Sequence, residues 1–144
     1  MGEARSQTKT PAYAKPALLA QTQLVKRPGA GADAPFGLAV APNGRHLVFA
    51  ASRSGVPELW LHDLSTGQTR ALPATEGAAF PFWAPDSARV GFFAAGRLRT
   101  IDLASGEVAD LTDAPAPRGG AWSATGDIIF APGADGPLVR RAAS

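Results

Sequence analysis

The sequence predicts an all-β fold made of repeated four-stranded antiparallel sheets. In residues 80–106, short runs of β-branched and aromatic residues alternate with turn-forming Pro, Asp, Ser and Gly. The same features recur 39 residues apart, in the pairs Asp63 and Asp102, Gly67 and Gly106, Leu72 and Leu111, and Trp83 and Trp122. Four short antiparallel strands in about 40 residues form one blade of a β-propeller. The chain is therefore predicted to be a partial β-propeller of about two and a half blades.

The central repeat, residues 80–118, shows the pattern most clearly. Its strands are predicted at residues 80–83, 90–93, 97–102 and 107–111. The segment Ala84-Pro85-Asp86-Ser87 is the first turn, and in the third strand two sets of side chains alternate, as a half-buried strand requires. Residues 102–106, Asp-Leu-Ala-Ser-Gly, form another turn, because Asp accepts hydrogen bonds from turn N–H groups and Gly supplies a positive φ.

The first repeat, residues 36–79, is a longer copy. Its strands are predicted at residues 36–40, 46–50, 58–63 and 68–72. Asn43-Gly44 suits the positive φ angles of a tight hairpin between the first two. Pro42 and Pro85 are 43 residues apart, so this repeat carries four extra residues, which fall in the loop 52–57.

The third repeat, residues 119–144, is shorter. Its strands are predicted at residues 121–122, 127–131 and 137–142, with Leu138 in the place of Leu98. A fourth strand is missing from the pattern, and closed propellers use about four to eight blades. We therefore expect a piece of a larger propeller, whose first and third blades each lack one neighbour.

Residues 1–35 are predicted to be a poorly ordered lead-in. Their one apolar run, Leu18–Val25, ends at Pro28-Gly-Ala-Gly31, is too short to span a bilayer, and has no signal-peptide character. Five Lys and Arg stand here against two acidic residues, whereas residues 36–144 hold nine Arg against ten acidic residues. The basic balance therefore belongs to the lead-in, and nucleic-acid binding through a basic face is not indicated.

The two histidines, His46 and His62, are the first candidates for chemistry. Two are too few for a three-histidine metal site, and the chain has no cysteine, which excludes disulfides and thiolate zinc sites. His62 and Asp63 are neighbours on a strand, so their side chains point to opposite faces. No Gly-x-Ser-x-Gly motif is present. We therefore predict structural roles for these residues and no catalytic, cofactor or metal site.

Three further groups of residues have a binding and a structural interpretation. Glu107, Asp110 and Asp113 are clustered acids, but they lack the spacing of a calcium loop. Arg97, Arg99, Arg140 and Arg141 lie on third strands, where a solvated face with paired charges is expected. Trp60, Trp83 and Trp122 are candidate binding aromatics. Since Trp83 and Trp122 recur at one blade position, we predict that both are largely buried between sheets, together with Phe92 and Phe130.

Several motifs of the repeats are specific. In the first copy they are Pro42-Asn43-Gly44-Arg45, Leu47-Val48-Phe49, Glu58-Leu59-Trp60 and Asp63; in the second, Trp83-Ala-Pro85-Asp86-Ser87, Phe92 and residues 98–102. On these motifs, residues 36–144 resemble the TolB-like, WD-type propeller repeats of bacterial proteins. The runs 80–87, Asp113-Ala-Pro115 and 118–122 are similar to propellers fused to bacterial serine/threonine kinase or winged-helix domains. The resemblance implies interaction or sensing surfaces, often outside the cytoplasm.

We expect a non-catalytic protein-interaction module that binds a protein partner or a second copy through open blade faces. Neither nucleic-acid binding nor membrane insertion is expected, and no cofactor is implied. Two alternatives stay open. One is a ligand-sensing extracytoplasmic segment of a serine/threonine protein kinase, and the other is the propeller gate of a serine peptidase.

Overall fold

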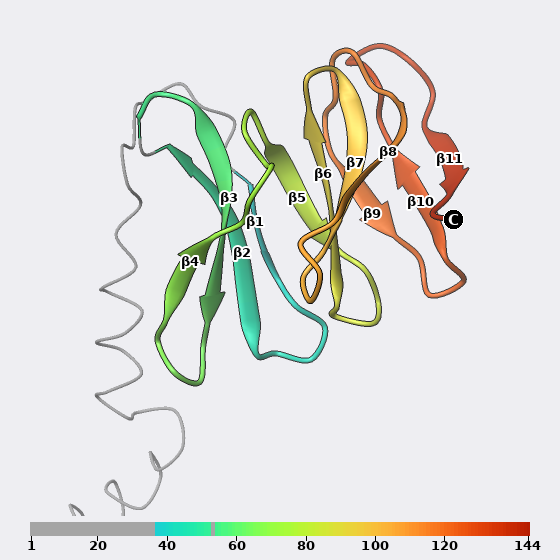
Figure 1. The fold of residues 1–144 in the computed structure, drawn as a ribbon. Coiled ribbons are helices and arrows are strands. Elements are labelled where there is room, and N and C mark those ends of the chain that lie inside the picture. The colour runs from blue at the N-terminus through green and yellow to red at the C-terminus, as the bar shows by residue number, and fades with distance from the viewer. Residues whose placement is uncertain (1–36, 53) are drawn as a thin grey trace, which may run out of the picture.

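The computed structural model describes residues 37–52 and 54–144, in which eleven strands form three antiparallel sheets and no helix occurs (Figure 1). Blade one contains β1 (Leu38–Val40), β2 (His46–Ser52), β3 (Pro57–Asp63) and β4 (Thr69–Ala71). Blade two contains β5 (Ala79–Trp83), β6 (Arg89–Ala94), β7 (Arg97–Asp102) and β8 (Val108–Asp113). Blade three contains β9 (Gly120–Trp122), β10 (Asp127–Phe130) and β11 (Val139–Ala142). The prediction of an all-β, partial propeller is confirmed.

The three blades stand side by side in chain order, and each strand pairs with its neighbours in sequence (Figure 1). The first strands of the blades are neighbours, since β5 contacts both β1 and β9. Antiparallel order places the β1–β2, β3–β4, β5–β6, β7–β8 and β9–β10 turns at one end. The turns after β2, β6 and β10 and the two connections between blades lie at the other end, which we call the crossover end.

Strand boundaries differ from the predicted ones by one or two residues at most positions. The first strand begins at Leu38 rather than Phe36, and Phe36 lies outside the described residues. The fourth strand of blade two begins one residue later than predicted and continues to Asp113, because Arg97 and Arg99 on β7 pair with Asp113 and Asp110 on β8. The run Leu18–Val25 also lies outside the described residues.

The apolar core fills the spaces between sheets. Blades one and two enclose one cluster that contains Val48, Leu59, Leu61, Trp83, Val90, Phe92 and Ile101. Blades two and three enclose another, made of Phe82, Phe93, Leu98, Ala114, Ile128 and Phe130. Phe92 and Phe93 are consecutive on β6 and enter different clusters, because successive side chains of a strand point to opposite faces. Blade two is therefore covered on both faces, and Phe92 and Phe130 are buried as predicted.

The two repeated tryptophans differ in burial. Trp83 is buried, and its indole N–H donates to the Ala39 carbonyl of β1 over 2.8 Å. Trp122 is only partly buried, at the edge of the cluster between blades two and three, so it is less buried than predicted. Its ring is covered by the guanidinium of Arg89, whose carbon lies 4.9 Å from the ring centroid. On the core side, the Trp122 ring meets Phe82 edge-on, with 6.4 Å between the ring centroids.

Leu138 also differs from its predicted equivalent. The register of β10 and β11 pairs Phe130 with Val139, so Leu138 lies just before the strand and is 70% exposed, whereas Leu98 is fully buried. Leu98 faces blade three, while no described sheet covers the corresponding face of blade three. Ile129, on that same face, is 42% exposed. We call this surface, Ile129 and Leu138 with the edge of β11, the trailing face.

The face of blade one that points away from blade two was expected to be open, because blade one has a neighbouring blade on one side only. It is partly closed. Leu38 and Val40 on β1 are exposed, but Phe49 on β2 and Trp60 on β3 are buried. The side chains of Phe49 and Trp60 point away from blade two, because Val48 and Leu59 beside them pack against it.

Among the described residues no segment is a helix long and apolar enough to cross a membrane.

Candidate functional site

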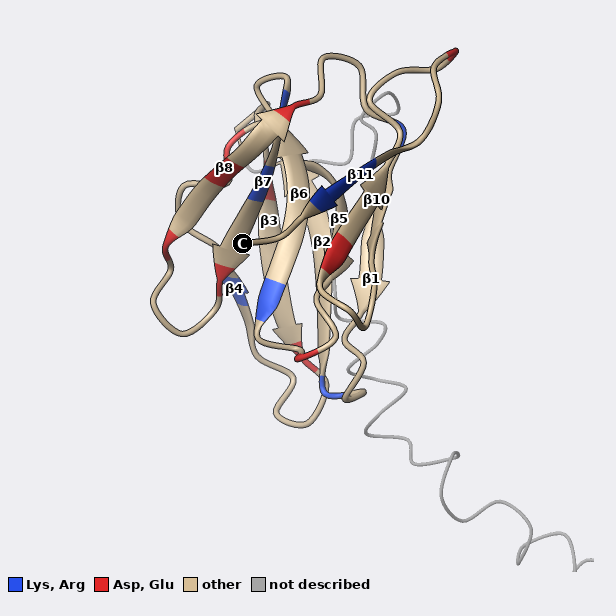
Figure 2. Cartoon of the chain, turned by 90° about the vertical axis from the view of Figure 1, so that its right-hand side faces the viewer, with Lys and Arg blue, Asp and Glu red and all other residues tan. Residues whose placement is uncertain are grey.

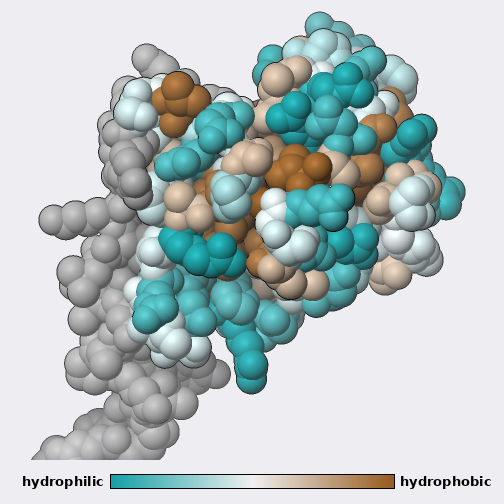
Figure 3. Space-filling model, viewed as in Figure 1, coloured by the Kyte–Doolittle hydropathy of each residue, from teal (hydrophilic) through white to brown (hydrophobic). Residues whose placement is uncertain are grey.

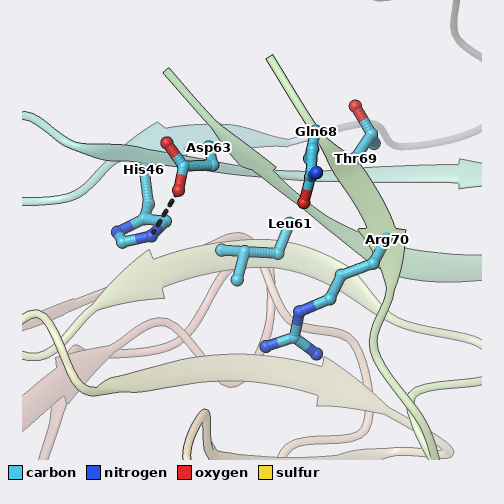
Figure 4. A pocket seen from close by; sticks show the side chains of 6 residues that line it. All are labelled: His46, Leu61, Asp63, Gln68, Thr69 and Arg70. Atoms are coloured by element: carbon cyan, nitrogen blue, oxygen red, sulfur yellow. Dashed lines mark ion pairs between the residues drawn. The ribbon is translucent and has the colours of Figure 1, made fainter. Parts of the chain in front are cut away.

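A surface pocket lies on the face of blade one that packs against blade two (Figure 4). It has a volume of about 360 Å³ and is lined by His46, Leu61, Asp63, Gln68, Thr69 and Arg70. These residues come from the start of β2, from β3 and from the β3–β4 turn and β4. In the space-filling view, hydrophobic residues show in the middle of this side of the molecule, with hydrophilic residues around them (Figure 3).

Asp63 is held in this pocket by the turn that it begins. Its Oδ1 accepts hydrogen bonds from the Ser65 N–H (2.8 Å), the Ser65 hydroxyl (2.5 Å) and the Thr66 N–H (3.1 Å). Gly67, with φ of 75°, closes the turn by donating its N–H to the Asp63 carbonyl over 2.8 Å. The Ser65 hydroxyl, with the backbone N–H groups of Ser65 and Thr66, lowers the pKa of Asp63 to about 2, and nearby His46 adds to this effect.

The same turn recurs in blade two, as the period predicts. Asp102 Oδ1 accepts from the N–H groups of Ala104 and Ser105, each over 2.9 Å, and Gly106 donates to the Asp102 carbonyl. These backbone hydrogen bonds are the main cause of the lowered pKa of Asp102. A basic residue stands opposite the aspartate in both blades, since His46 pairs with Asp63 and Arg89 pairs with Asp102 in the strand register. This repetition indicates a structural role for the aspartates.

The order of the groups in the pocket does not suit nucleophilic catalysis. His46 Nε2 lies 3.8 Å from Asp63 Oδ2, and the Ser65 hydroxyl donates to the other oxygen of the same carboxylate. In a catalytic triad the histidine stands between serine and aspartate and takes the proton of the serine. Here the carboxylate stands between serine and histidine, so His46 has no path to the Ser65 proton.

Two other residues of the pocket, Thr69 and Arg70, differ in their contacts. The Thr69 hydroxyl lies 2.7 Å from Nδ1 of His62, which is buried on the opposite face of β3 from Asp63, as predicted. The guanidinium of Arg70 points into the pocket without an ion pair to any described residue (Figure 4). The pocket therefore offers one cation and several polar groups to a ligand, but no nucleophile with a base beside it.

The clustered acids of β8 are bound to arginines of β7. Asp110 lies 2.7 Å from Arg99 Nε and 3.3 Å from Arg97 Nε, and Asp113 lies 3.4 Å from Arg97 Nη1. Figure 2 shows these acidic and basic stretches beside each other on the two strands. Within the described part of the chain, no group of three or more metal-binding side chains comes together. The paired-charge interpretation fits Arg97 and Arg99 better than a calcium site at these acids.

Blade three has one comparable ion pair. Arg140 on β11 lies 2.5 Å from Asp127 on β10, and this contact lowers the pKa of Asp127. Arg141, the next residue, is exposed. Of the tryptophans, Trp83 and Trp122 serve the packing between blades, and Trp60 is buried in blade one.

A second pocket, which sequence reasoning missed, lies at the crossover end of blades two and three. It has a volume of about 290 Å³ and is lined by Gly77, Ala79, Phe80, Phe93, Ala94, Ala95, Gly96, Ala116, Pro117 and Arg118. These residues belong to three separate connections and to the strand ends beside them. The residues are mostly Gly and Ala, which carry no recognisable motif, so their convergence is visible only in the tertiary structure.

We compared the sequence and the three-bladed fold with those of known proteins. No protein-family model matches the sequence, and no curated protein matches it. The structure is similar to TolB from Acinetobacter baumannii, with 18% identity over 72% of this chain and 29% of that chain and a TM-score of 0.60. A putative TolB from Agrobacterium tumefaciens gives 19% identity over 79% and 41% of the two chains, with a TM-score of 0.55. The β-propeller domain of the trilobed protease from Pyrococcus furiosus gives 15% identity over 60% of this chain and 30% of that chain, with a TM-score of 0.53.

These matches cover less than half of each known chain, and their sequence identities are low. Because likeness at this level concerns the backbone arrangement and not the site residues, it supports no transfer of activity. The comparisons show that this chain has the β-propeller fold that is also found in TolB.

Proposed function

We propose that this chain is a non-catalytic protein-interaction module whose main contact surface is the trailing face of blade three. One observation carries the proposal: within the described residues, blade three has two exposed apolar side chains and an unpaired outer edge of β11 at the place where blade two is covered by its neighbour. Ile129 and Leu138 are exposed there, whereas Leu98 of blade two is fully buried.

The edge of β11 adds to this surface. Within the described residues β11 pairs with β10 alone, so its outer N–H and C=O groups have no strand partner. A strand edge of this kind binds another chain through main-chain hydrogen bonds, and an exposed apolar patch next to it favours association. The partner that we propose is a protein surface with its own sheet, of which a second copy of this chain is the simplest case.

Light scattering on a sizing column, over a dilution series, tests the proposal. We expect the mean mass of the wild-type chain to fall on dilution, and Ile129→Glu or Leu138→Glu to give a monomer at every concentration. Val56→Glu is the matched control, because Val56 is 53% exposed but lies in the β2–β3 connection of blade one. A concentration-independent wild-type monomer with strongly protected amides in residues 127–141 would contradict self-association.

The absence of catalysis is the second part of the proposal, and the geometry of His46, Asp63 and Ser65 supports it. Screens for peptidase, esterase, phosphatase and kinase activity are expected to give background values. Activity that disappears in His46→Ala or His62→Ala would overturn this part.

The likeness to the trilobed protease supports a second candidate, in which the propeller accompanies a catalytic domain. The matched part of that protein is named as a propeller domain, so it is one part of a larger protein. An adjoining hydrolase or kinase coding sequence in the same reading frame would favour this candidate over a self-contained interaction module.

A further inference from the structure

The crossover-end pocket has the size and position of a small binding site. Its walls come from the β4–β5 connection at Gly77, the β6–β7 turn at Ala95 and Gly96, and the β8–β9 connection at residues 116–118. Its volume of about 290 Å³ lies just below the range of ligand pockets, roughly 300–1,000 Å³. A pocket of this size accommodates a small molecule or the end of a peptide.

The pocket is apolar because its lining side chains are small or aromatic. The partly buried Phe80 forms its large apolar wall, and glycines, alanines and the edge of the buried Phe93 form the rest. The pocket is open because glycine and alanine have small side chains that do not fill it. It therefore suits an apolar group of a ligand.

Two lining residues have an unfavourable backbone conformation. Phe80 has φ of 50° and Ala95 has φ of 52°, a region in which residues with a Cβ are uncommon and a bulky one is an outlier. Conformations of this kind are costly and concentrate at ligand-binding and other functional sites. Of the four non-glycine residues with positive φ in the described chain, these two lie on the same pocket.

Arg118 supplies the charge. Among the described residues that line the pocket it alone is charged, and no acidic residue of residues 37–52 and 54–144 forms an ion pair with it. Asp113, the last residue of β8, is already paired with Arg97. The planar guanidinium of arginine matches a carboxylate, which it binds through two parallel hydrogen bonds.

We infer that this pocket binds a carboxylate attached to an apolar group, with the carboxylate on Arg118 and the apolar group against Phe80 and the alanines beside it. The C-terminal residue of a partner protein carries this chemistry, and so does a small apolar carboxylic acid. The inference rests on the proposed binding function and names a class of partner for it, but it uses a surface distinct from the trailing face.

Two-dimensional NMR of the full chain, titrated with N-acetyl-Ala-Ala-Leu and with the C-terminal amide of the same peptide, tests the inference. We expect the free acid to shift the backbone N–H signals of residues 77–80, 94–96 and 116–118. The peptide amide is expected to bind at least about tenfold more weakly, because it lacks the negative charge. N-Acetylleucine distinguishes the two sources. Weaker binding than that of the peptide identifies a peptide end, and equal binding identifies a small acid.

The variants separate a site from a nonspecific effect. Arg118→Gln is expected to remove the preference for the free acid while the spectrum stays folded, and Arg141→Gln, an exposed arginine on β11, is expected to keep it. Equal binding of acid and amide, shifts that map elsewhere, or no binding at millimolar concentration would each overturn the inference. None of these results changes the mass of the chain on dilution, so failure here is distinguishable from failure of the trailing-face proposal.

Discussion

The indole N–H of Trp83 on β5 donates to the carbonyl of Ala39 on β1 over 2.8 Å, which joins blade two to blade one at their first strands. The ring packs beside His46 in the same space, with 6.4 Å between ring centroids. One side chain therefore supplies both apolar contact and a polar link between two sheets that share no strand hydrogen bonds.

This position makes Trp83 a sensitive test of blade packing. We expect Trp83→Ala to lower the free energy of unfolding by about 3–5 kcal/mol, as for other buried aromatic residues. Trp83→Phe is expected to cost about 1–3 kcal/mol, because the Ala39 carbonyl loses its donor. Urea unfolding measures both. Trp122→Ala, at the partly exposed equivalent, is expected to cost less than Trp83→Ala, and the reverse order would contradict our account of the two interfaces.

Gly91 on β6 is required by close packing. A Cβ built there overlaps the ring of Phe82 on the adjacent strand. We expect Gly91→Ala to lower the free energy of unfolding by about 1–3 kcal/mol through overpacking. Gly91→Ala is expected to cost less unfolding free energy in a chain that also carries Phe82→Leu, because leucine leaves room for the new methyl group. A double-mutant cycle measures this difference.

Gly133→Ala is the matched control for that cycle, since a Cβ at Gly133 meets nothing within 4 Å and the residue has no positive φ. We expect this variant to unfold like the wild-type chain. Additive effects of Gly91→Ala and Phe82→Leu would show that the two residues do not compete for the same space.

Ala95 stores backbone strain in the two-residue turn between β6 and β7. Ala95 and Gly96 have φ of 52° and 71°, and type I′ turns with positive φ at both positions prefer Asn-Gly. We expect Ala95→Asn to raise the free energy of unfolding by about 1 kcal/mol, and Gly96→Ala to lower it by about 1–2 kcal/mol. Thermal unfolding checks both directions. A destabilising Ala95→Asn would show that the alanine is held there by packing and not merely tolerated.

Asp63 makes stability depend on pH in the acidic range. Its pKa in the folded chain is about 2, against an ordinary value of 3.8. A carboxyl whose pKa is lowered by folding stabilises the chain above its unfolded pKa, and that contribution is lost as the pH falls through the folded value. We expect Asp63→Asn to destabilise the chain at neutral pH and to differ little from the wild type below pH 2.

NMR titration of the Asp63 carboxyl measures its pKa directly. Ser65→Ala removes the hydroxyl that donates to the carboxylate and is expected to raise the midpoint toward 3.8. A midpoint that stays near 2 in Ser65→Ala would assign the shift to the backbone N–H groups of the turn.

The blades and their turns were predictable from sequence because their causes are local. The spacing of Asp63 from Gly67, and of Asp102 from Gly106, encodes a turn whose hydrogen bonds all lie within five residues. Strands at residues 90–93 and 97–102 follow from their composition and from the turns that bound them. A repeat of such features at one spacing then specifies the sheet order, because consecutive strands pair.

Burial and the pockets depended on which blade covers which face, and only the tertiary structure decided this. Leu98 and Leu138 hold equivalent places in their repeats, yet one is fully buried and the other 70% exposed, because only the first has a described sheet against it. Likewise, Phe80, Ala95 and Arg118 are far apart in sequence and meet at one pocket. Phe80 and Ala95 meet because β5 pairs with β6, and Arg118 joins them through the connection to blade three, for which no local pattern exists.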